Sequence, residues 1–530
     1  MSASTSGPRV LTTSLGGSAL TRALLGGSGA AWLTPRPVDE TEWRTHAEAL
    51  RAEMRGRDWL AALTPALSSG TAGVDRLRRS AAEQGIVVTT GQQPGLFGGP
   101  MYTWTKALAV LALADEIQDA TGVPVAPVFW AATDDTDLAE ARTTHVAVRG
   151  GLEALSLPGT AADGASLRDV PLGDVSALLD ALARATGSAV DPRVLERTRE
   201  AYVPGVTVGQ AYLTLLRSML EPLGIAVLDG GDPAVRRAAH PILVRALERA
   251  GAEDSALTTR TSEMQAAGFE PQVSNVPSLT VVFRYGDGSR ERVPVTEAAE
   301  AARRAAPGTL GPNVLLRPIV ERTLLPTAAY VAGPGEIAYF AQVSALAEAL
   351  GTAQPVALPR WGAIVVEPHI DRILQRYELS LESMRDEGVV ERMLARRGLP
   401  RPVRDALERA RQQLAESVAE IARAVERTGF PLAPEVVKGL DATVRRRVER
   451  FERRVLAAQK RRDAQTAADI ATARAALFPL GRPQERVLNF IPILARHGTP
   501  LLDAMLERAR EHARRLVNGV AAPESAPSTR

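Results

Sequence analysis

A strand, a glycine-rich turn, a helix and a second strand follow one another between residues 86 and 132, and this order constrains the fold more than any other feature. Ile86–Thr90 is a short β-branched run, and the turn Gly91–Pro100 follows it directly. Met101–Gln118 places leucine, alanine and valine at helical spacing before the apolar run Val123–Ala132. The strands of such a β-α-β unit are parallel, so the loops 91–100 and 133–137 should open at the same sheet edge.

A second strand–turn–helix junction occurs about 240 residues later in the chain. Thr327–Ala332 is strand-like, Gly333–Gly335 is a turn, and Glu336–Leu350 has a helical pattern. The region between the junctions is less regular, with a helix expected near Thr207–Leu223 and a strand at Ile225–Leu228. These signals predict an open α/β sheet.

Insertions into that sheet explain the irregular middle region. The expected core spans residues 1–375, with inserted connecting segments at about 150–205 and 230–310. The second of these contains a hairpin candidate around Gly286–Gly288.

The sequence changes character after about residue 370, where Arg, Glu, Ala and Leu dominate. Two long amphipathic helices, roughly 402–428 and 435–477, are separated by the turn 429–434. This pattern predicts an antiparallel coiled-coil hairpin within a domain at 376–480.

The last part of the chain is expected to return to the core as a helical segment at 481–520. Gln484–Pro492 is predicted to be helical, and the Pro/Ser-rich tail 521–530 is predicted to be disordered.

Charge and cysteine content exclude several classes of function. The 530-residue chain has 63 basic and 61 acidic residues and no cysteine, so disulfides, a thiol nucleophile and cysteine-bound metals are ruled out. A net charge of +2 gives no reason to expect nucleic acid or membrane as a partner. The polar start 1–9 lacks the apolar core of a signal peptide and no long apolar run is present, so a cytoplasmic protein is expected.

The turn before the first long helix has the features of an anion site. Pro100 stands where the helix starts, and Lys106, one of three lysines in the chain, falls on the second turn in line with Tyr102. Backbone amides at a helix start attract anions, which favours phosphate or nucleotide binding. The alternative is a tight turn that needs glycine for steric reasons alone. The glycines of this turn are Gly91, Gly95, Gly98 and Gly99.

An acidic loop, Thr133-Asp134-Asp135-Thr136-Asp137, follows the neighbouring strand. Three carboxylates at the carboxyl end of a strand could bind Mg²⁺, orient an amine or act as a base. The alternative is helix N-capping by Thr133 or Asp134.

The second junction supplies further candidates. Glu336 and Tyr339 lie in the first turns of a helix that starts after Gly333, and Arg317 upstream could bind a carboxylate ligand through two hydrogen bonds. Alternatively, Glu336 simply complements its helix dipole.

Histidines and nucleophile motifs add little. No HxxH or HExxH spacing and no GxSxG motif occurs. His145 is the best placed histidine because it follows the acidic loop, although a buried structural role is the simpler interpretation.

Five sequence blocks together resemble the cysteine-adding enzyme family of bacillithiol biosynthesis. The similarity extends from about Ile86 to Phe490, with the blocks in the same order as in the family. The blocks are Thr89–Thr105 followed by Lys106, Pro127–Asp135, Asn313–Ile319, Leu325–Tyr339 and Gln484–Asn489.

This resemblance implies a Rossmann-like core with connecting insertions, and a C-terminal coiled coil that makes a homodimer. It implies addition of L-cysteine to glucosaminyl-malate, and a distant likeness to class I synthetases makes ATP or another nucleotide the suspected cofactor, with Mg²⁺ as a possible companion. The family usually has a histidine where this chain has Thr136, and threonine cannot shuttle protons near neutral pH.

Transferred by position, the resemblance gives two sets of candidate residues. The catalytic candidates are Lys106, Asp134, Asp135, Asp137 and His145. The substrate- or nucleotide-binding candidates are Thr90, Gly91, Gln92, Gln93, Gly95, Gly98, Gly99, Tyr102, Arg317, Gly333, Glu336 and Tyr339.

The leading hypothesis is therefore an amide-forming ligase with Lys106 stabilising negative charge and the acidic loop positioning Mg²⁺ or the attacking amine. Two alternatives stay open: a catalytically reduced nucleotide-binding or scaffold protein, and a ligase for another amino acid and amine.

Overall fold

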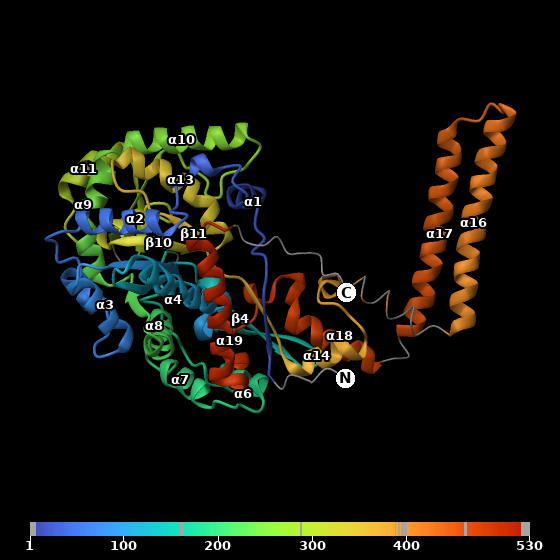
Figure 1. Cartoon of the computed structure of the whole chain (residues 1–530), viewed down its shortest axis with the longest axis horizontal. Helices are drawn as coiled ribbons and strands as arrows, with labels where there is room; N and C mark the ends of the chain where they lie inside the picture. Colours follow the sequence, from blue (N-terminus) through green and yellow to red (C-terminus); the bar gives the residue numbers. More distant parts are fainter. Residues whose placement is uncertain are drawn as a thin grey trace. The chain divides into compact units, whose positions relative to one another are not determined.

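The computed structural model divides the chain into two compact units (Figure 1). The first unit contains Met1–Val146, Glu153–Val365 and Gln484–Arg530, and the second contains Ala147–Leu152 and Val366–Pro483. The structure describes residues 7–159, 164–286, 289–386, 388, 390, 393, 400–460 and 464–520. The predicted disordered tail 521–530 lies outside the described residues.

A parallel five-stranded sheet forms the centre of the first unit. Its strands are almost wholly buried and rich in valine and alanine, as expected for a sheet covered on both faces. Gly91 pairs with Trp130 across one strand pair, and Tyr330 pairs with Thr89 across the next. The strand order is β11 (Ala357–Pro359), β10 (Thr327–Ala332), β2 (Ile86–Gln92), β3 (Val125–Ala131) and β6 (Ala226–Asp229). The predicted α/β class is confirmed.

Two long buried helices make the crossovers at the centre of this sheet. The helix α4 (Tyr102–Thr121) connects β2 to β3, and α13 (Pro334–Leu350) connects β10 to β11. Because β2 and β10 are neighbours, the two crossovers leave the centre in opposite directions. In open α/β sheets such a switch point is where ligands bind, beyond the carboxyl ends of the strands.

Further helices surround the sheet. The helix α19 (Ile491–Val517) packs on α4, α3 (Ala72–Ala82) packs on β3 and β6, and α10 (Ala250–Ala266) packs on α13 (Figure 1). Other helices of this unit are α2 (Glu40–Glu53), α6 (Ser176–Thr186), α7 (Arg193–Ala201), α8 (Val208–Leu220) and α9 (Pro233–Glu248).

The second inserted segment contains the predicted hairpin. Strands β7 (Leu279–Gly286) and β8 (Ser289–Pro294) pair antiparallel, and β9 (Leu310–Pro312) completes a small sheet. The turn residues 287 and 288 lie outside the described residues. The short helices α11 (Ala298–Arg304) and α12 (Arg317–Leu324) follow β8 and β9. Strand β4 (Thr143–Val148) lies just before the first inserted segment and pairs with β5 (Gly151–Ser156) at its start.

The described residues of the segment 366–483 in the second unit are largely helical, and the predicted coiled-coil hairpin is present. α16 (Arg401–Thr428) and α17 (Pro434–Lys460) run antiparallel and pack on each other (Figure 1). Gly429 ends α16 with a positive φ of 62°, a conformation that favours glycine. α18 (Ala464–Leu477) follows after residues 461–463, which the structure does not describe, and α14 (Pro368–Arg376) packs on it.

The prediction of a helix at Gln484–Pro492 is wrong. Only a 3₁₀ turn, Gln484–Arg486, precedes an irregular stretch, and α19 begins at Ile491. Tertiary contacts override the local pattern because Leu488 pairs with His145 and Asn489 pairs with Pro100, two chain segments far away in sequence.

Candidate active site

The carboxyl ends of the parallel strands bring the predicted motifs to one edge of the sheet. The glycine turn follows β2, the acidic loop follows β3, and Gly333 follows β10. Since β2 lies between β3 and β10, all three loops are neighbours. The shared edge of loops 91–100 and 133–137 was predicted, whereas the place of the Gly333 loop beside them was not.

Lys106 of α4 and Glu336 of α13 meet across the switch point. The Lys106 ammonium lies 2.6 Å from Glu336 Oε2 and also donates to the Gly91 carbonyl (2.7 Å) and Gln92 Oε1 (3.0 Å). Glu336 Oε2 accepts the Gly333 amide as well, at 2.6 Å, and so caps its own helix. One side chain from each of the two long helices thus contributes to a buried ion pair.

A phenol and a second ion pair extend this cluster. The Tyr330 hydroxyl donates to Glu336 Oε1 at 2.6 Å, and Arg317 Nη2 donates to that hydroxyl at 3.0 Å and to the Tyr339 hydroxyl at 3.4 Å. Arg317 Nη1 binds Glu321 Oε2, one helical turn along α12, at 3.0 Å. Arg317 was expected to meet a ligand carboxylate; in this structure it is matched to Glu321.

Burial and pairing set the ionisation of these groups. Burial alone would raise the pKa of Glu336, but Lys106, the Tyr330 hydroxyl and the Gly333 amide outweigh it, so that pKa lies below its usual range. Burial lowers the pKa of Lys106, and Glu336 opposes that effect. Burial also raises the pKa of Tyr339.

The glycine turn does not present the open amides that were predicted. The Gly98 amide donates to the Gly95 carbonyl (3.0 Å), the Gly99 amide to the Leu96 carbonyl (3.1 Å) and the Met101 amide to the Leu488 carbonyl (2.8 Å). That prediction is therefore wrong for these amides, and the residues do not fit a phosphate at the start of α4.

Steric demands explain the glycines of this turn instead. Phe97, Gly98 and Gly99 all have positive φ, and a Cβ on Gly95 would lie 2.7 Å from Gly99 Cα. The side-chain amide of Asn489 holds the turn by donating to three of its carbonyls, those of Leu96, Phe97 and Gly99, at 3.0–3.3 Å.

Two other predicted residues of this block, Gly91 and Thr90, have different surroundings. A Cβ on Gly91 would come within 3.3 Å of both Arg317 Nη1 and the Tyr330 hydroxyl, so Gly91 lets the cluster approach the backbone. Thr90 instead ties β2 to β10 through its hydroxyl, which donates to the Val331 carbonyl at 2.8 Å.

A chain of polar contacts leads from Lys106 toward the acidic loop. The side-chain amide of Gln92 donates through Nε2 to Gln93 Oε1 (2.7 Å) and to the Tyr102 hydroxyl (3.2 Å). The Tyr102 hydroxyl donates in turn to Glu140 Oε1 at 3.5 Å. Glu140 was not predicted, although it follows the acidic loop by only three residues.

The three aspartates of the acidic loop have different surroundings. Asp137 Oδ1 accepts the Glu140 amide and caps the short helix α5 (Leu138–Ala141), and Asp135 Oδ1 accepts the Asp137 amide, both at 2.8 Å. Asp134 instead faces Tyr285, whose hydroxyl donates to Oδ2 at 3.4 Å. Burial, the largest effect, raises the pKa of Asp134.

Asp229 at the end of β6 and Arg168, which follows β5, hold this loop in place and were not predicted. The Thr133 hydroxyl donates to Asp229, the last residue of β6, and Arg168 binds the same carboxylate. The backbone amide of Arg168 also donates to the Thr133 carbonyl at 2.8 Å. Asp229 and the pair Gly230-Gly231, which follow the predicted strand 225–228, were the available signal for this support.

Arg360, which follows β11, is a further residue that the sequence analysis missed. Its guanidinium binds Glu485 through Nη1 (2.8 Å) and Nη2 (2.6 Å), and Nη1 also donates to the Thr105 hydroxyl (3.1 Å). This buried pair connects α4 to the segment that carries Asn489.

His145 is not joined to the acidic loop. It lies half-buried on β4, and its backbone carbonyl accepts a hydrogen bond from the backbone amide of Asn489 at 2.8 Å. Burial lowers the pKa of its imidazole ring. Within the described residues no hydrogen bond links its imidazole to an aspartate of the loop.

Neither a metal site nor a membrane span was found in the described residues. In the described part of the chain, no group of three or more His, Asp and Glu side chains is arranged to hold a metal ion. No described helix combines the length and apolar character needed to cross a bilayer.

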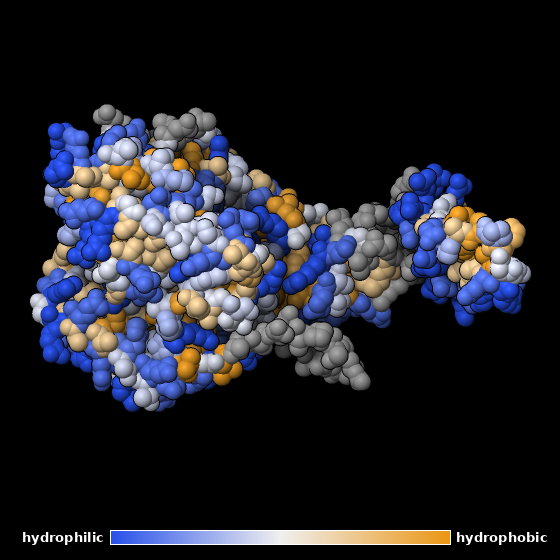
Figure 2. Space-filling model, turned by 90° about the horizontal axis from the view of Figure 1, so that it is seen from above, coloured by the Kyte–Doolittle hydropathy of each residue, from blue (hydrophilic) through white to orange (hydrophobic). Residues whose placement is uncertain are grey.

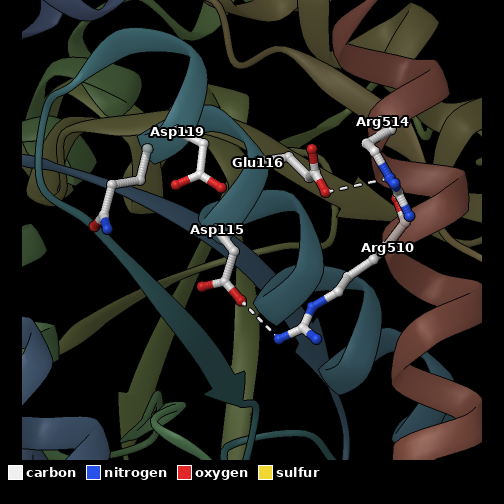
Figure 3. A pocket seen from close by; sticks show the side chains of 6 residues that line it. Asp115, Glu116, Asp119, Arg510 and Arg514 are labelled. Carbon is white, nitrogen blue, oxygen red and sulfur yellow. Dashed lines mark hydrogen bonds and ion pairs between the residues drawn. The ribbon is translucent and has the colours of Figure 1, made fainter.

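A shallow surface pocket lies at the other end of α4 (Figure 3). Asp115 and Glu116 face Arg510 and Arg514 of α19, each pair 3.6 Å apart. These pairs fasten α19 to α4, so the pocket is part of helix packing.

The parallel sheet with its switch-point cluster defines a Rossmann-like α/β protein, to which an antiparallel coiled coil is attached. A family model described as "Bacillithiol biosynthesis BshC, N-terminal Rossmann-like domain" matches residues 36–361, and its coiled-coil counterpart matches residues 363–515. The chain belongs to the BshC family of bacillithiol biosynthesis.

Relatives in this family are similar over most of their length. The chain is 34% identical to a protein of Solibacter usitatus, over 83% of this chain and 86% of the relative. It is 32% identical to one of Koribacter versatilis (83% and 84%) and 31% identical to one of Thermus thermophilus (86% and 93%). All three carry the name "Putative cysteine ligase BshC".

Proposed function

We propose that the protein joins the carboxyl group of L-cysteine to the amine of glucosaminyl-malate, forming an amide in the last step of bacillithiol biosynthesis. Family membership and the relatives' ligase name support this reaction. The Lys106–Glu336 ion pair is the observation that supports an active site at the switch point, because it brings two sequence blocks of the family into contact there.

The chemistry assigns a role to Asp134. The amine of glucosaminyl-malate is an ammonium at neutral pH and must lose a proton before it attacks a carboxyl carbon. A half-buried carboxylate whose pKa is raised is a matched acceptor for that proton. Asp134 therefore orients the ammonium and takes its proton, while Asp135 and Asp137 shape the loop.

The buried ion pair serves the carboxyl group of cysteine. A free carboxylate has no leaving group, so the cysteine carboxyl group is first activated by a phosphoryl or nucleotidyl group, for which ATP or another nucleotide is the suspected source. The amine then forms the C–N bond while the bond from that carbon to the activated oxygen breaks, and the oxygen leaves with the activating group. As the amine attacks, negative charge develops on the carbonyl oxygen, and a fixed ammonium at low dielectric stabilises it strongly. Glu336 and the Gly91 carbonyl hold the Lys106 ammonium in one position, so little reorganisation is needed during the reaction.

The reaction is tested with purified protein, glucosaminyl-malate and cysteine, with and without ATP and Mg²⁺, read by mass spectrometry. Product is expected from the natural protein and from Lys438→Met, which removes an exposed lysine of α17, and not from Lys106→Met. Intact substrates under every nucleotide condition would refute the proposal.

We further propose that the protein is a homodimer through the coiled coil and acts in the cytoplasm. The hairpin α16–α17 exposes large apolar side chains, seen as orange patches in Figure 2; Phe430 is 62% and Phe451 58% exposed. Leu414 and Ile421, seven residues apart on α16, are also exposed, so α17 leaves part of the apolar surface of α16 uncovered. Light scattering tests this, and a monomeric full-length protein would contradict it.

A further inference from the structure

Three side chains from the second inserted segment converge on Asp134. Tyr285 of β7 donates its hydroxyl to Asp134 Oδ2 at 3.4 Å. Arg290 of β8 donates to the Asp134 carbonyl (3.3 Å) and to the Thr136 hydroxyl (3.1 Å). The Arg236 guanidinium of α9 lies over the Tyr285 ring, 4.6 Å from its centroid. All of these side chains are half-buried, so each keeps surface that a ligand can reach.

The backbone around this group is built to accommodate Tyr285. Gly311 on the neighbouring strand β9 lies against its ring, and a Cβ there would come within 2.5 Å of the ring carbon. Any side chain at position 311 would push Tyr285 and the stacked Arg236 away from Asp134. The position of the phenol is therefore fixed by packing.

Arg236 and Arg290 form no close ion pair within the described residues, and Asp134 is the carboxylate whose pKa, raised by burial, their charges lower. Among the described residues neither Arg236 nor Arg290 has a carboxylate within ion-pair distance, and the buried Nε of Arg236 has no hydrogen-bond partner. By contrast, the arginines at other places on this sheet edge each bind a carboxylate of the chain: Arg168 binds Asp229, Arg317 binds Glu321 and Arg360 binds Glu485. A half-buried guanidinium without an anion favours binding of an anionic ligand.

We propose that Arg236, Arg290 and Tyr285 form a subsite that binds a carboxylate of the malyl group. This rests on the proposed function and adds to it which part of the amine substrate is recognised, and by which residues. Two guanidinium groups beside the Asp134 carboxylate complement a ligand with two carboxylates and one ammonium, which is the charge pattern of glucosaminyl-malate. The subsite places the malyl carboxylates on the arginines and the ammonium on Asp134. A phosphate, which carries no ammonium, would leave Asp134 facing an anion.

Calorimetric binding without turnover tests the subsite on the full-length protein. The ligands are glucosaminyl-malate, L-malate, inorganic phosphate and methyl glucosaminide, which has the amine but no malyl group. Arg236→Gln and Arg290→Gln are each expected to weaken glucosaminyl-malate about tenfold, the effect of one charge-assisted hydrogen bond. Binding of methyl glucosaminide should stay unchanged in both variants.

Matched controls come from the same elements. Arg237→Gln removes the exposed neighbour of Arg236 on α9, and Arg284→Gln removes an exposed arginine of β7 that faces Glu297. Both should bind glucosaminyl-malate like the natural protein. Because Arg236 and Arg290 lie on different elements, a folding defect in one variant leaves the other as a test, and Arg290→Lys should retain part of the affinity.

Three results would overturn the subsite: glucosaminyl-malate bound equally well by both glutamine variants, an equal loss for methyl glucosaminide, or phosphate competing where malate does not. A natural protein that binds glucosaminyl-malate through these arginines but forms no amide would support the subsite and refute the proposed reaction.

Discussion

Lys106 Nζ lies 2.6 Å from Glu336 Oε2, and this contact joins the second turn of α4 to the first turn of α13, two helices whose crossovers leave the sheet in opposite directions. Each residue stands near the start of its own helix, 230 residues apart in sequence. The contact therefore connects the glycine turn after β2 with the Gly333 loop after β10.

Breaking this pair should destabilise the fold. Lys106→Met leaves the Glu336 carboxylate buried without its cation, which costs about 3–5 kcal/mol in the free energy of unfolding. The double variant Lys106→Met/Glu336→Gln removes both charges and should recover much of that loss without recovering activity. Urea unfolding measures both effects, and Lys438→Met should stay within about 0.5 kcal/mol of the natural protein. A single variant as stable as the natural protein would show that the pair contributes little.

A different carboxyl group should make stability depend on pH. Glu253 on α10 is 1% exposed, neither of its oxygens has a hydrogen-bond partner among the described residues, and burial raises its pKa to about 8. The unfolded chain releases this proton at about pH 4.3, whereas the folded protein keeps it to about pH 8. The folded state binds more protons across that window, so stability falls as pH rises through it.

Glu253→Leu removes this effect. Relative to the variant, the natural protein should lose about 4 kcal/mol of unfolding free energy between about pH 5 and pH 8. Urea unfolding at both values tests this, with Glu263→Gln on the exposed face of the same helix as the control. An equal difference at the two pH values would mean that Glu253 is ionised in the folded protein.

Variants of Asp134 and Asp137 should distinguish a residue that takes part in catalysis from one that stabilises the loop. Asp134→Asn removes the proton acceptor and should lower kcat about 100-fold or more, with stability unchanged or slightly increased because a buried carboxyl group becomes neutral. Asp137→Ala removes an N-cap and should cost about 1 kcal/mol with a much smaller effect on kcat. Steady-state kinetics and urea unfolding on both variants distinguish these roles. The opposite ranking of kcat would assign the proton transfer to Asp137.

The Asn489 amide should be essential for the glycine turn. Asn489→Leu removes the side-chain donor that the Leu96, Phe97 and Gly99 carbonyls share, although the Leu96 carbonyl keeps the Gly99 amide. We expect a loss of about 2–3 kcal/mol in unfolding free energy. Faster hydrogen exchange at Gly98 and Gly99 would localise the loss. Asn518→Ala near the end of α19 is the control. Unchanged exchange at the turn would show that the glycines hold this conformation alone.

The sequence predicted the sheet and the helices well because strand–turn–helix patterns are local. Lys106 and Glu336 were each identified as candidates, but their contact depends on β2 and β10 being neighbours, which no local pattern encodes. The ion pair between Arg317 and Glu321 could have been predicted from the sequence, since Glu321 stands at the i+4 position of the same helix.

Contacts between distant segments explain the errors. The glycine turn was expected to offer open amides, but the Met101 amide donates to Leu488, almost 390 residues away in sequence. The same contacts keep Gln484–Pro492 from forming the expected helix, because Asn489 and Leu488 pair with other segments. Arg236 and Arg290 were not predicted because only the folded insertion brings them to Asp134.

Formation of the amide at the switch point is tested most directly with glucosaminyl-malate labelled with ¹⁵N at its amine. The label is followed by NMR during incubation with cysteine, each protein variant, and ATP with Mg²⁺ present or absent. The account predicts that the ¹⁵N signal moves from the amine to the amide region with the natural protein and Lys438→Met, and stays at the amine with Lys106→Met. An amide signal of equal rate with Lys106→Met, or none with the natural protein under any condition, would contradict it.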